Sequence, residues 1–143
     1  KMKFLIINGP NLNLIGIREP AIYGKESLEH IISWVTKQVD TLKYDLQWFQ
    51  SNSEGEIINK LHWAFESKFN GIIINAGAYT HYSYAIRDAI SAINIPTVEV
   101  HLSDINSRED FRKKSVIKDV TIKQIAGRGK EGYLEAINLL SKF

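Results

Sequence analysis

Cysteine is absent from the sequence. The chain therefore has no disulfide framework and no metal site built on thiolates. Neither sign of charge prevails, because 18 lysines and arginines stand against 16 aspartates and glutamates, for a formal net charge of +2. So small an excess, with no basic stripe interleaved with aromatic residues, indicates that nucleic acid is not a partner.

Long hydrophobic runs are also missing. No apolar stretch approaches the ~20 residues that cross a bilayer, and no signal peptide is recognisable. We therefore expect no membrane partner and a cytoplasmic location. A chain of 143 residues, 44% of them hydrophobic, suits one compact domain with a sizeable core, so we expect a single domain over residues 1–143.

Short segments typical of buried strands alternate with helical patterns along the chain. The expected strands cover residues 4–7, 45–50, 71–74, 97–101 and 120–125. Ser27 and Ser53 are expected to cap the first two helices, and Ser107 is expected to cap a short charged helix. The expected buried faces include Phe65 on the second helix and Ala85 on the third.

Strands that alternate with helices five times predict a parallel α/β sheet covered on both faces. The common order for five such strands is 2-1-3-4-5, with a topological switch point between the first and third strands. Polar residues stand where the first, third and fourth strands end, at residues 8–11, 75–81 and 99–101. Because sheets of this kind bind ligands at the carboxyl ends of their strands, the three segments are expected to converge on one cleft.

Histidines at these strand ends are candidates for acid–base chemistry. His101 and Glu99 point to the same face of a strand, so Glu99 could hold one imidazole nitrogen and leave the other free. The alternative is a half-buried structural histidine. His81, close to Asn75, is expected to contact a ligand, whereas His30 and His62 lie within helical patterns and are expected to be exposed or packed.

Arg18 and Tyr23 share a long connection after the first strand. A tyrosine with a pKa of ~10 is about one part in a thousand ionised at pH 7, a deficit of roughly 4 kcal/mol. A guanidinium about 4 Å away offsets about that much at an effective dielectric of ~20. Arg18 could therefore make Tyr23 a general base. The alternative is a packed tyrosine and a solvated arginine.

Arg108 and Arg112 are expected on one face of the short helix that follows His101. Arginine binds carboxylates in a bidentate fork, so the pair could clamp an anion. The backbone N–H groups of Leu102 and Ser103 could serve the same anion. The alternative is a solvated charged face.

The segment 127–132 fits the pattern G-x-G-x-x-G between a strand and a helix. A dinucleotide site is not expected there, because no second strand follows to carry the acidic ribose ligand. The glycines are expected to form a tight turn. No pair of histidine, aspartate or glutamate residues has familiar metal-ligand spacing, so no metal is expected.

Two other classes of function belong to the same sheet order. A receiver module of a response regulator needs an acidic cluster at the end of the first strand. This chain has Asn8-Gly9-Pro10-Asn11 there, which argues against that class. An electron carrier that binds a flavin or a nucleotide stays possible on sequence grounds. A colourless purified protein would count against a bound flavin.

Dispersed motifs resemble those of the type II 3-dehydroquinate dehydratases over essentially the whole chain. The motifs are the segments 7–14, 18–20 with 23–24, 50–52 with 54–56, 75–81, 99–103, 108–109 with 112, and 132–133. The resemblance implies a flavodoxin-like three-layer sandwich and a single catalytic domain. It implies reversible trans-dehydration of 3-dehydroquinate to 3-dehydroshikimate through an enolate, without a Schiff-base lysine, metal or organic cofactor. That lyase reaction serves the shikimate pathway, which leads to chorismate and aromatic amino acids, or quinate catabolism.

The resemblance also implies catalytic roles, residue by residue. Tyr23 looks like the general base that removes a proton from C2, and Arg18 like the group that lowers its pKa. Asn11 looks like the holder of a water that stabilises the enolate. His101, oriented by Glu99, looks like the acid that protonates the departing C1 hydroxyl.

The remaining family positions imply substrate contacts. Asn75 and His81 resemble contacts to substrate hydroxyls. Arg112, with the backbone of residues 102–103, resembles the carboxylate and hydroxyl site, and Arg108 matches a lid-closing arginine. The family resemblance implies a homododecamer of four trimers, in which Asp88 looks like a residue that reaches a neighbour's active site.

Overall fold

A five-stranded parallel sheet forms the centre of the protein in the computed structural model, which describes residues 1–17 and 26–143. The strands lie in the order β2-β1-β3-β4-β5, which confirms the predicted topology. Their bounds are β1 Met2–Asn8, β2 Tyr44–Gln50, β3 Gly71–Asn75, β4 Thr97–His101 and β5 Lys123–Ala126. All four neighbouring pairs are parallel, so the carboxyl ends of the strands share one edge.

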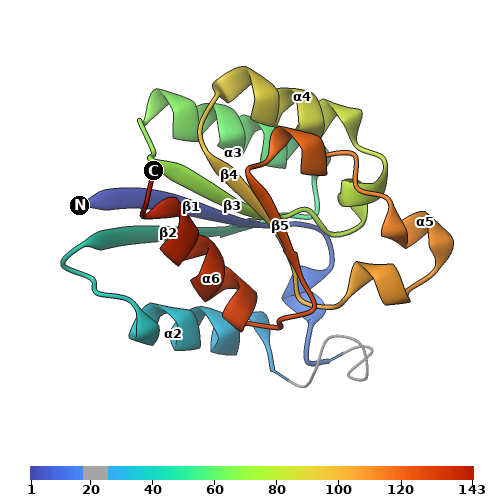
Figure 1. The fold of residues 1–143 in the computed structure, drawn as a ribbon, viewed down its shortest axis with the longest axis horizontal. Helices are drawn as coiled ribbons and strands as arrows, with labels where there is room; N and C mark the ends of the chain where they lie inside the picture. Colours follow the sequence, from blue (N-terminus) through green and yellow to red (C-terminus); the bar gives the residue numbers. More distant parts are fainter. Residues whose placement is uncertain (18–25) are drawn as a thin grey trace.

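Helices cover both faces of the sheet and make the sandwich three layers deep (Figure 1). The helices α2 (Leu28–Gln38) and α6 (Glu131–Leu140) pack on one face, and α3 (Glu54–Glu66) and α4 (Tyr84–Ile93) on the other. Successive residues of β1 serve the two faces in turn, since Phe4 and Ile6 belong to the first core and Leu5 and Ile7 to the second. A sheet covered in this way explains why its strands are apolar without alternation.

Serine side chains begin three of these helices. Ser27, Ser53 and Ser83 each accept a hydrogen bond from a backbone N–H three residues ahead. The first two caps were predicted, and the third sets the start of α4 just beyond the residues of the site. Each such cap is worth about 1 kcal/mol.

Two predicted boundaries are wrong for local reasons. Val120 belongs to a 3-10 turn, Lys118–Val120, because Ser115 Oγ accepts from the backbone N–H of Lys118 and starts that turn. The strand β5 begins only where Lys123 pairs with Val98. Ser107 ends another 3-10 turn, Ile105–Ser107, and its hydroxyl donates to the backbone carbonyl of Asp104, so it caps no helix.

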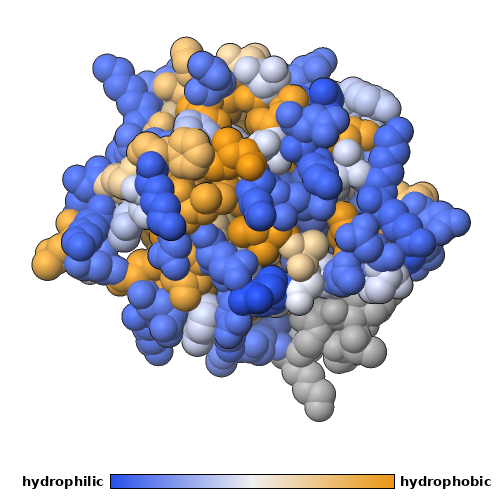
Figure 2. Space-filling view, viewed as in Figure 1, coloured by the Kyte–Doolittle hydropathy of each residue, from blue (hydrophilic) through white to orange (hydrophobic). Residues whose placement is uncertain are grey.

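Two side chains predicted for buried faces lie outside them. Phe65 is 58% exposed, because Ile57, Leu61 and Ala64 already fill the buried stripe of α3. Ala85 is exposed on α4, where the buried stripe starts at the next residue. Other large apolar side chains also reach the surface, and hydrophobic areas lie between hydrophilic ones on the face shown in Figure 2. None of the described helices is long and apolar enough to span a membrane.

Gly9 marks a close approach between the ends of β1 and β3. A Cβ at this position would stand 2.6 Å from the carbonyl oxygen of Ala76, and the Gly9 backbone N–H donates to Asn75 at 2.7 Å. Replacement Gly9→Ala should therefore lower the free energy of unfolding by about 1–3 kcal/mol, since two backbone segments must separate. Chemical denaturation measures this change.

A matched control for Gly9→Ala is available in α3. A Cβ at Gly55 would meet no atom closer than Ser53 Oγ at 3.9 Å, and the position is exposed. Gly55→Ala should raise stability by up to about 1 kcal/mol, because alanine is the better helix former. Equal stability of Gly9→Ala and the unmodified protein would contradict the proposed close approach.

Candidate active site

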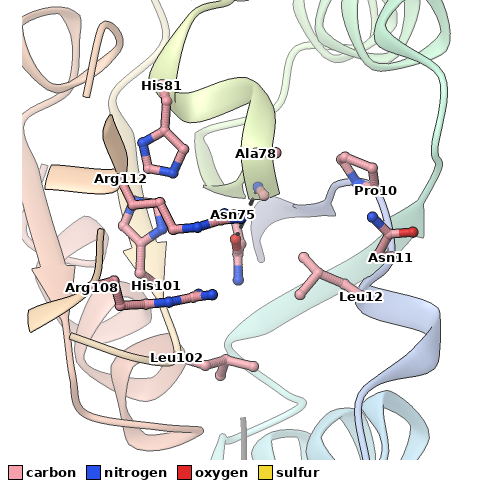
Figure 3. Close-up of a pocket in the computed structure, with 11 residues that line it drawn as sticks. Pro10, Asn11, Leu12, Asn75, Ala78, His81, His101, Leu102, Arg108 and Arg112 are labelled. Atoms are coloured by element: carbon pink, nitrogen blue, oxygen red, sulfur yellow. Dashed lines mark hydrogen bonds between the residues drawn. The ribbon is translucent and has the colours of Figure 1, made fainter. Parts of the chain in front are cut away.

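A cavity of about 410 Å³ opens at the carboxyl ends of β1, β3 and β4, beside the switch point of the sheet. In Figure 3 residues 10–12 lie on one side of it, and the side chains of Arg108 and Arg112 reach toward Asn75 from the other. The strand ends that the sequence placed at one cleft do meet there. The lining residues are Pro10, Asn11, Leu12, Asn75, Gly77, Ala78, His81, His101, Leu102, Arg108 and Arg112.

His101 and Glu99 form a buried pair at the end of β4. His101 Nε2 lies 2.5 Å from Glu99 Oε2, and the two side chains are 6% and 0% exposed. The pairing is the one expected from two residues on the same face of a strand. It leaves Nδ1 as the imidazole nitrogen available to the cavity.

Glu99 accepts further hydrogen bonds that the sequence did not predict. Ser115 Oγ lies 2.9 and 3.1 Å from the two carboxylate oxygens, and Gln124 Nε2 donates to Oε2 at 3.1 Å. Ser115 Oγ donates to this carboxylate and also accepts from the backbone N–H of Lys118. Because each of these partners donates, Glu99 accepts as a carboxylate, and His101 carries its proton on Nε2.

The contact between Gln124 and Glu99 could have been predicted from the register in which β4 and β5 pair. Gln124 stands directly opposite Glu99 in the parallel pair of β4 and β5. Polar residues on the same face of adjacent strands can reach each other. The predicted strand at 120–125 included Gln124, but its register against β4 was unknown.

His81 faces the cavity as a neutral imidazole. Its Nδ1 lies 2.7 Å from the backbone carbonyl oxygen of Lys114, so Nδ1 carries the proton and Nε2 is an acceptor. Burial lowers the pKa of His81 most, the hydrogen bond to Lys114 raises it, and the nearby His101 and Arg112 lower it further. At neutral pH this site therefore offers a hydrogen-bond acceptor to a ligand.

Asn11 and Asn75 stand at the ends of β1 and β3. Asn75 Oδ1 accepts from the backbone N–H of Gly77 at 3.2 Å, and Asn75 is 3% exposed. Asn11 has a left-handed backbone (φ 69°), which asparagine tolerates better than most residues. Its backbone N–H donates to Asn52 Oδ1 at 3.0 Å, while its side chain is exposed at the cavity.

Arg108 and Arg112 reach the cavity from different segments of the chain. Arg112 lies on α5 (Asp110–Lys113), but Arg108 precedes that helix in extended backbone, so the prediction of one shared helical face is wrong. The helix begins only at Asp110, since Ser107 belongs to the preceding 3-10 turn. Arg112 Nε donates to Glu109 Oε2 at 2.5 Å and the side chain keeps 27% of its surface exposed.

The glycine-rich segment 127–132 forms hydrogen bonds with the backbone of residues 102–103, next to the cavity. Gly127 and Gly129 have positive φ values of 78° and 54°, so the segment is the tight turn predicted between β5 and α6. Their backbone N–H groups donate to the carbonyls of Ser103 and Leu102, both at 3.1 Å. The turn thereby fixes the backbone of residues 102–103, whose N–H groups were predicted to serve an anion.

Other predicted residues lie away from the cavity lining or outside the described residues. Asp88 is exposed on α4. Arg18 and Tyr23 belong to residues 18–25, which the structure does not describe. His30 and His62 are exposed. Among residues 1–17 and 26–143 no group of three histidine, aspartate or glutamate side chains could hold a metal ion.

The cavity combines three chemical capacities. Arginine side chains can bind a carboxylate, a neutral histidine and an asparagine can bind hydroxyl groups, and a buried histidine–carboxylate pair can move a proton. This set suits a small hydroxylated acid.

Comparison with known proteins agrees with this chemistry. A family described as dehydroquinase class II matches residues 2–141. A 3-dehydroquinate dehydratase of Caldicellulosiruptor bescii is 54% identical over 140 residues, which are 98% of this chain and 97% of the relative. The structure resembles type II dehydroquinases from Butyrivibrio crossotus (TM-score 0.95, 48% identity, 98% and 97% of the two chains) and Propionibacterium acnes (TM-score 0.94, 34% identity, 100% and 98%).

Proposed function

The chain belongs to the class II dehydroquinase family and is a type II 3-dehydroquinate dehydratase, a lyase of the shikimate pathway, and we propose that it works by trans elimination through an enolate. The observation that carries this proposal is the convergence of His101, His81 and Asn75 with two arginines on one cavity. These residues supply an acid, hydroxyl contacts and carboxylate contacts for one small hydroxylated acid. We assign the activity to a single catalytic domain over residues 1–143.

The substrate carboxylate binds Arg112 and the backbone N–H groups of residues 102–103. Support comes from the position of Arg112 on the cavity wall and from the hydrogen bonds that the 127–129 turn makes to the carbonyls of residues 102 and 103. Arg108 closes the site over the bound acid. Asn75 and His81 bind ring hydroxyls, and the acceptor Nε2 of His81 suits a hydroxyl donor.

Tyr23, as the phenolate, takes the proton from C2, which is weakly acidic because it is α to the ketone. The electron pair of the C–H bond moves to the carbonyl oxygen and forms the enolate. A water held by Asn11 donates a hydrogen bond to that oxygen, and donors placed in advance are the most effective stabilisation for such a charge. Arg18 favours the ionised form of Tyr23.

His101 completes the elimination. The enolate electrons return to form the C1–C2 double bond, and the bond from C1 to its hydroxyl oxygen breaks. His101 Nδ1 gives its proton to that oxygen, so the group leaves as water, and the Glu99 carboxylate stabilises the imidazolium that precedes transfer. The proton that Tyr23 gained and the one that His101 lost then equilibrate with solvent.

Ultraviolet absorbance tests the reaction directly. Added 3-dehydroquinate should produce rising absorbance with metal-free protein, because the product is a conjugated enone and the substrate is not. Borohydride added during turnover should trap no lysine adduct, since the route contains no imine. A flat trace from folded protein would refute the proposed reaction, and a trapped adduct would refute the enolate route.

Assembly and location stay predictions. We propose a homododecamer of four trimers in which Asp88 reaches a neighbouring active site, and a cytoplasmic enzyme. Exposed aromatic side chains lie at and just before the start of α4, with Tyr82 and Tyr84 59% and 58% exposed, and Tyr84 stands one helical turn before Asp88. Such surface suits burial between copies. Sedimentation analysis would report the mass of the assembly.

A further inference from the structure

The buried Glu99 carboxylate accepts from two side chains besides His101. Ser115 Oγ lies 2.9 and 3.1 Å from its two oxygens, and Gln124 Nε2 donates to Oε2 at 3.1 Å. Ser115 lies just before the 3-10 turn Lys118–Val120, and Gln124 lies on β5. Neither side chain lines the cavity. Each can therefore act on a ligand only through Glu99 and His101.

The proton between Glu99 Oε2 and His101 Nε2, which are 2.5 Å apart, decides what kind of acid His101 is. When this proton is on Nε2 and Nδ1 is protonated too, the ring is an imidazolium and a good proton donor. When the same proton is on Glu99, the ring is a neutral imidazole and a much weaker acid at Nδ1. Burial favours the neutral arrangement, because it contains no charge, and the two side chains are only 6% and 0% exposed.

Ser115 and Gln124 oppose this effect of burial. Hydrogen bonds donated to a carboxylate favour its ionised form. The amide nitrogen of Gln124 can only donate, so it suits an ionised Oε2. The Ser115 hydroxyl lies within hydrogen-bond distance of both carboxylate oxygens, and its own oxygen accepts from the backbone N–H of Lys118.

The charged side chains around the pair do not replace these two donors. His81, Arg108 and Arg112 line the cavity together with His101, whereas Glu99 does not. Positive charge beside the imidazole disfavours a second positive charge on the ring. On α4, Arg87 donates to the backbone carbonyl of Val116 at 2.7 Å. The other charged residues on α4, residues 114–120 and β5 are exposed, namely Asp88, Lys114, Lys118, Asp119 and Lys123.

We propose that Ser115 and Gln124 are positioning residues that keep Glu99 ionised and so hold the shared proton on His101, which then acts as an imidazolium acid. The proposal rests on the proposed function, because it deepens the role of His101 in that same site. The segment around Ser115 serves the other histidine as well, since the backbone carbonyl of Lys114 accepts from His81 Nδ1. One short segment thus sets the proton positions of both histidines.

The kinetics of Gln124→Met test the proposal, because methionine keeps the length of the side chain and removes the donor. We expect kcat for 3-dehydroquinate to fall about tenfold, the loss typical of a hydrogen bond to a charged group, with KM within about twofold. In a Glu99→Gln background the same change should alter kcat less than about twofold, since no carboxylate is left to stabilise. Gln47→Met on β2 is the matched control and should leave kcat unchanged.

Ser115 variants separate its hydroxyl from its volume. Ser115→Ala should lower kcat about tenfold, and Ser115→Thr, which keeps the hydroxyl, should restore most of the rate. Ser115→Ala also removes the acceptor for the Lys118 backbone N–H. Gln124→Met therefore carries the test where Ser115→Ala folds poorly.

Solid-state NMR of protein labelled with nitrogen-15 histidine identifies the unprotonated ring nitrogen without any turnover. The His101 signals are those missing from His101→Ala. Over a pH series the unprotonated nitrogen of His101 should be Nδ1 in the unmodified protein, whereas a form with unprotonated Nε2 should appear in the double variant Ser115→Ala/Gln124→Met.

Three results would overturn the proposal. They are a kcat within twofold of normal in folded Gln124→Met, an equal loss of kcat in the Glu99→Gln background, and a folded double variant in which only Nδ1 is ever unprotonated. The expected spectra from a protein that never converts 3-dehydroquinate would instead defeat the proposed function alone.

Discussion

Replacing Tyr23 with phenylalanine should reduce kcat by about 10³-fold or more and leave substrate affinity within about threefold. Loss of a general base typically costs 10²–10⁴-fold, and here no other group has been assigned to the C2 proton. Phenylalanine keeps the aromatic ring, so little contact area is lost. Initial rates from enone absorbance give kcat, and calorimetry with quinate gives the affinity.

The pH dependence of kcat in Arg18→Ala tests whether Tyr23 acts as a base or only contacts the substrate. An ionised phenol needs roughly 4 kcal/mol at pH 7, which a guanidinium about 4 Å away can supply. Without Arg18 the ascending limb of kcat should therefore move to higher pH. A residue that only packs against the substrate would change affinity and leave this limb in place.

Tyr44→Phe serves as the control for Tyr23→Phe. It removes the same hydroxyl from a tyrosine at the opposite edge of the sheet, and its kcat should match that of the unmodified enzyme. Turnover of Tyr23→Phe within tenfold of normal would remove Tyr23 from the role of base.

Removal of the imidazole in His101→Ala should lower kcat by about 10²–10⁴-fold, because hydroxide is a poor leaving group without a proton donor. The change also takes one of the donors from the fully buried Glu99 carboxylate. We therefore expect a loss of stability of a few kcal/mol beside the loss of rate. Melting curves must accompany the kinetics, so that unfolding is not mistaken for lost catalysis.

Glu99→Gln isolates the role of the carboxylate with almost no change in volume. The amide nitrogen of glutamine would donate to His101 Nε2, and the imidazole would then keep its proton on Nδ1 as a neutral and weaker acid. We expect kcat to fall about 10²-fold or more with the fold intact. Near-normal kcat in both His101→Ala and Glu99→Gln would mean that another group protonates the leaving oxygen.

Local patterns in the sequence were sufficient for the sheet and for most of the cavity wall. Apolar runs predicted the strands, serine caps marked the starts of the first two helices, and parallel topology put residues 8–11, 75–81 and 99–101 at one edge. The Glu99–His101 pair followed from the two-residue period of a strand. Each of these inferences needs only neighbours in sequence or the general geometry of a parallel sheet.

Such local patterns do not predict contacts between segments that are distant in the sequence. Ser115, Gln124 and Tyr133 form hydrogen bonds with partners 16, 25 and 125 residues away, and no periodicity in the sequence predicts contacts over those distances. Arg108 was placed on the wrong element because Ser107 has the spacing of a helix cap, yet its hydroxyl bonds Asp104 instead. The local signal failed there because the Ser107 hydroxyl donates to a carbonyl three residues earlier and caps no helix.

The support of the cavity by the last strand, turn and helix has a consequence for synthesis on the ribosome. Every described residue that lines the cavity lies between Pro10 and Arg112, whereas Ser115, Gln124 and the 127–129 turn come later in the chain. A nascent chain that has emerged as far as Arg112 contains the residues that line the cavity but none of the later residues that hold them in place. Because chains emerge from the amino end and domains fold as units, the ordered pocket forms only when translation is nearly finished.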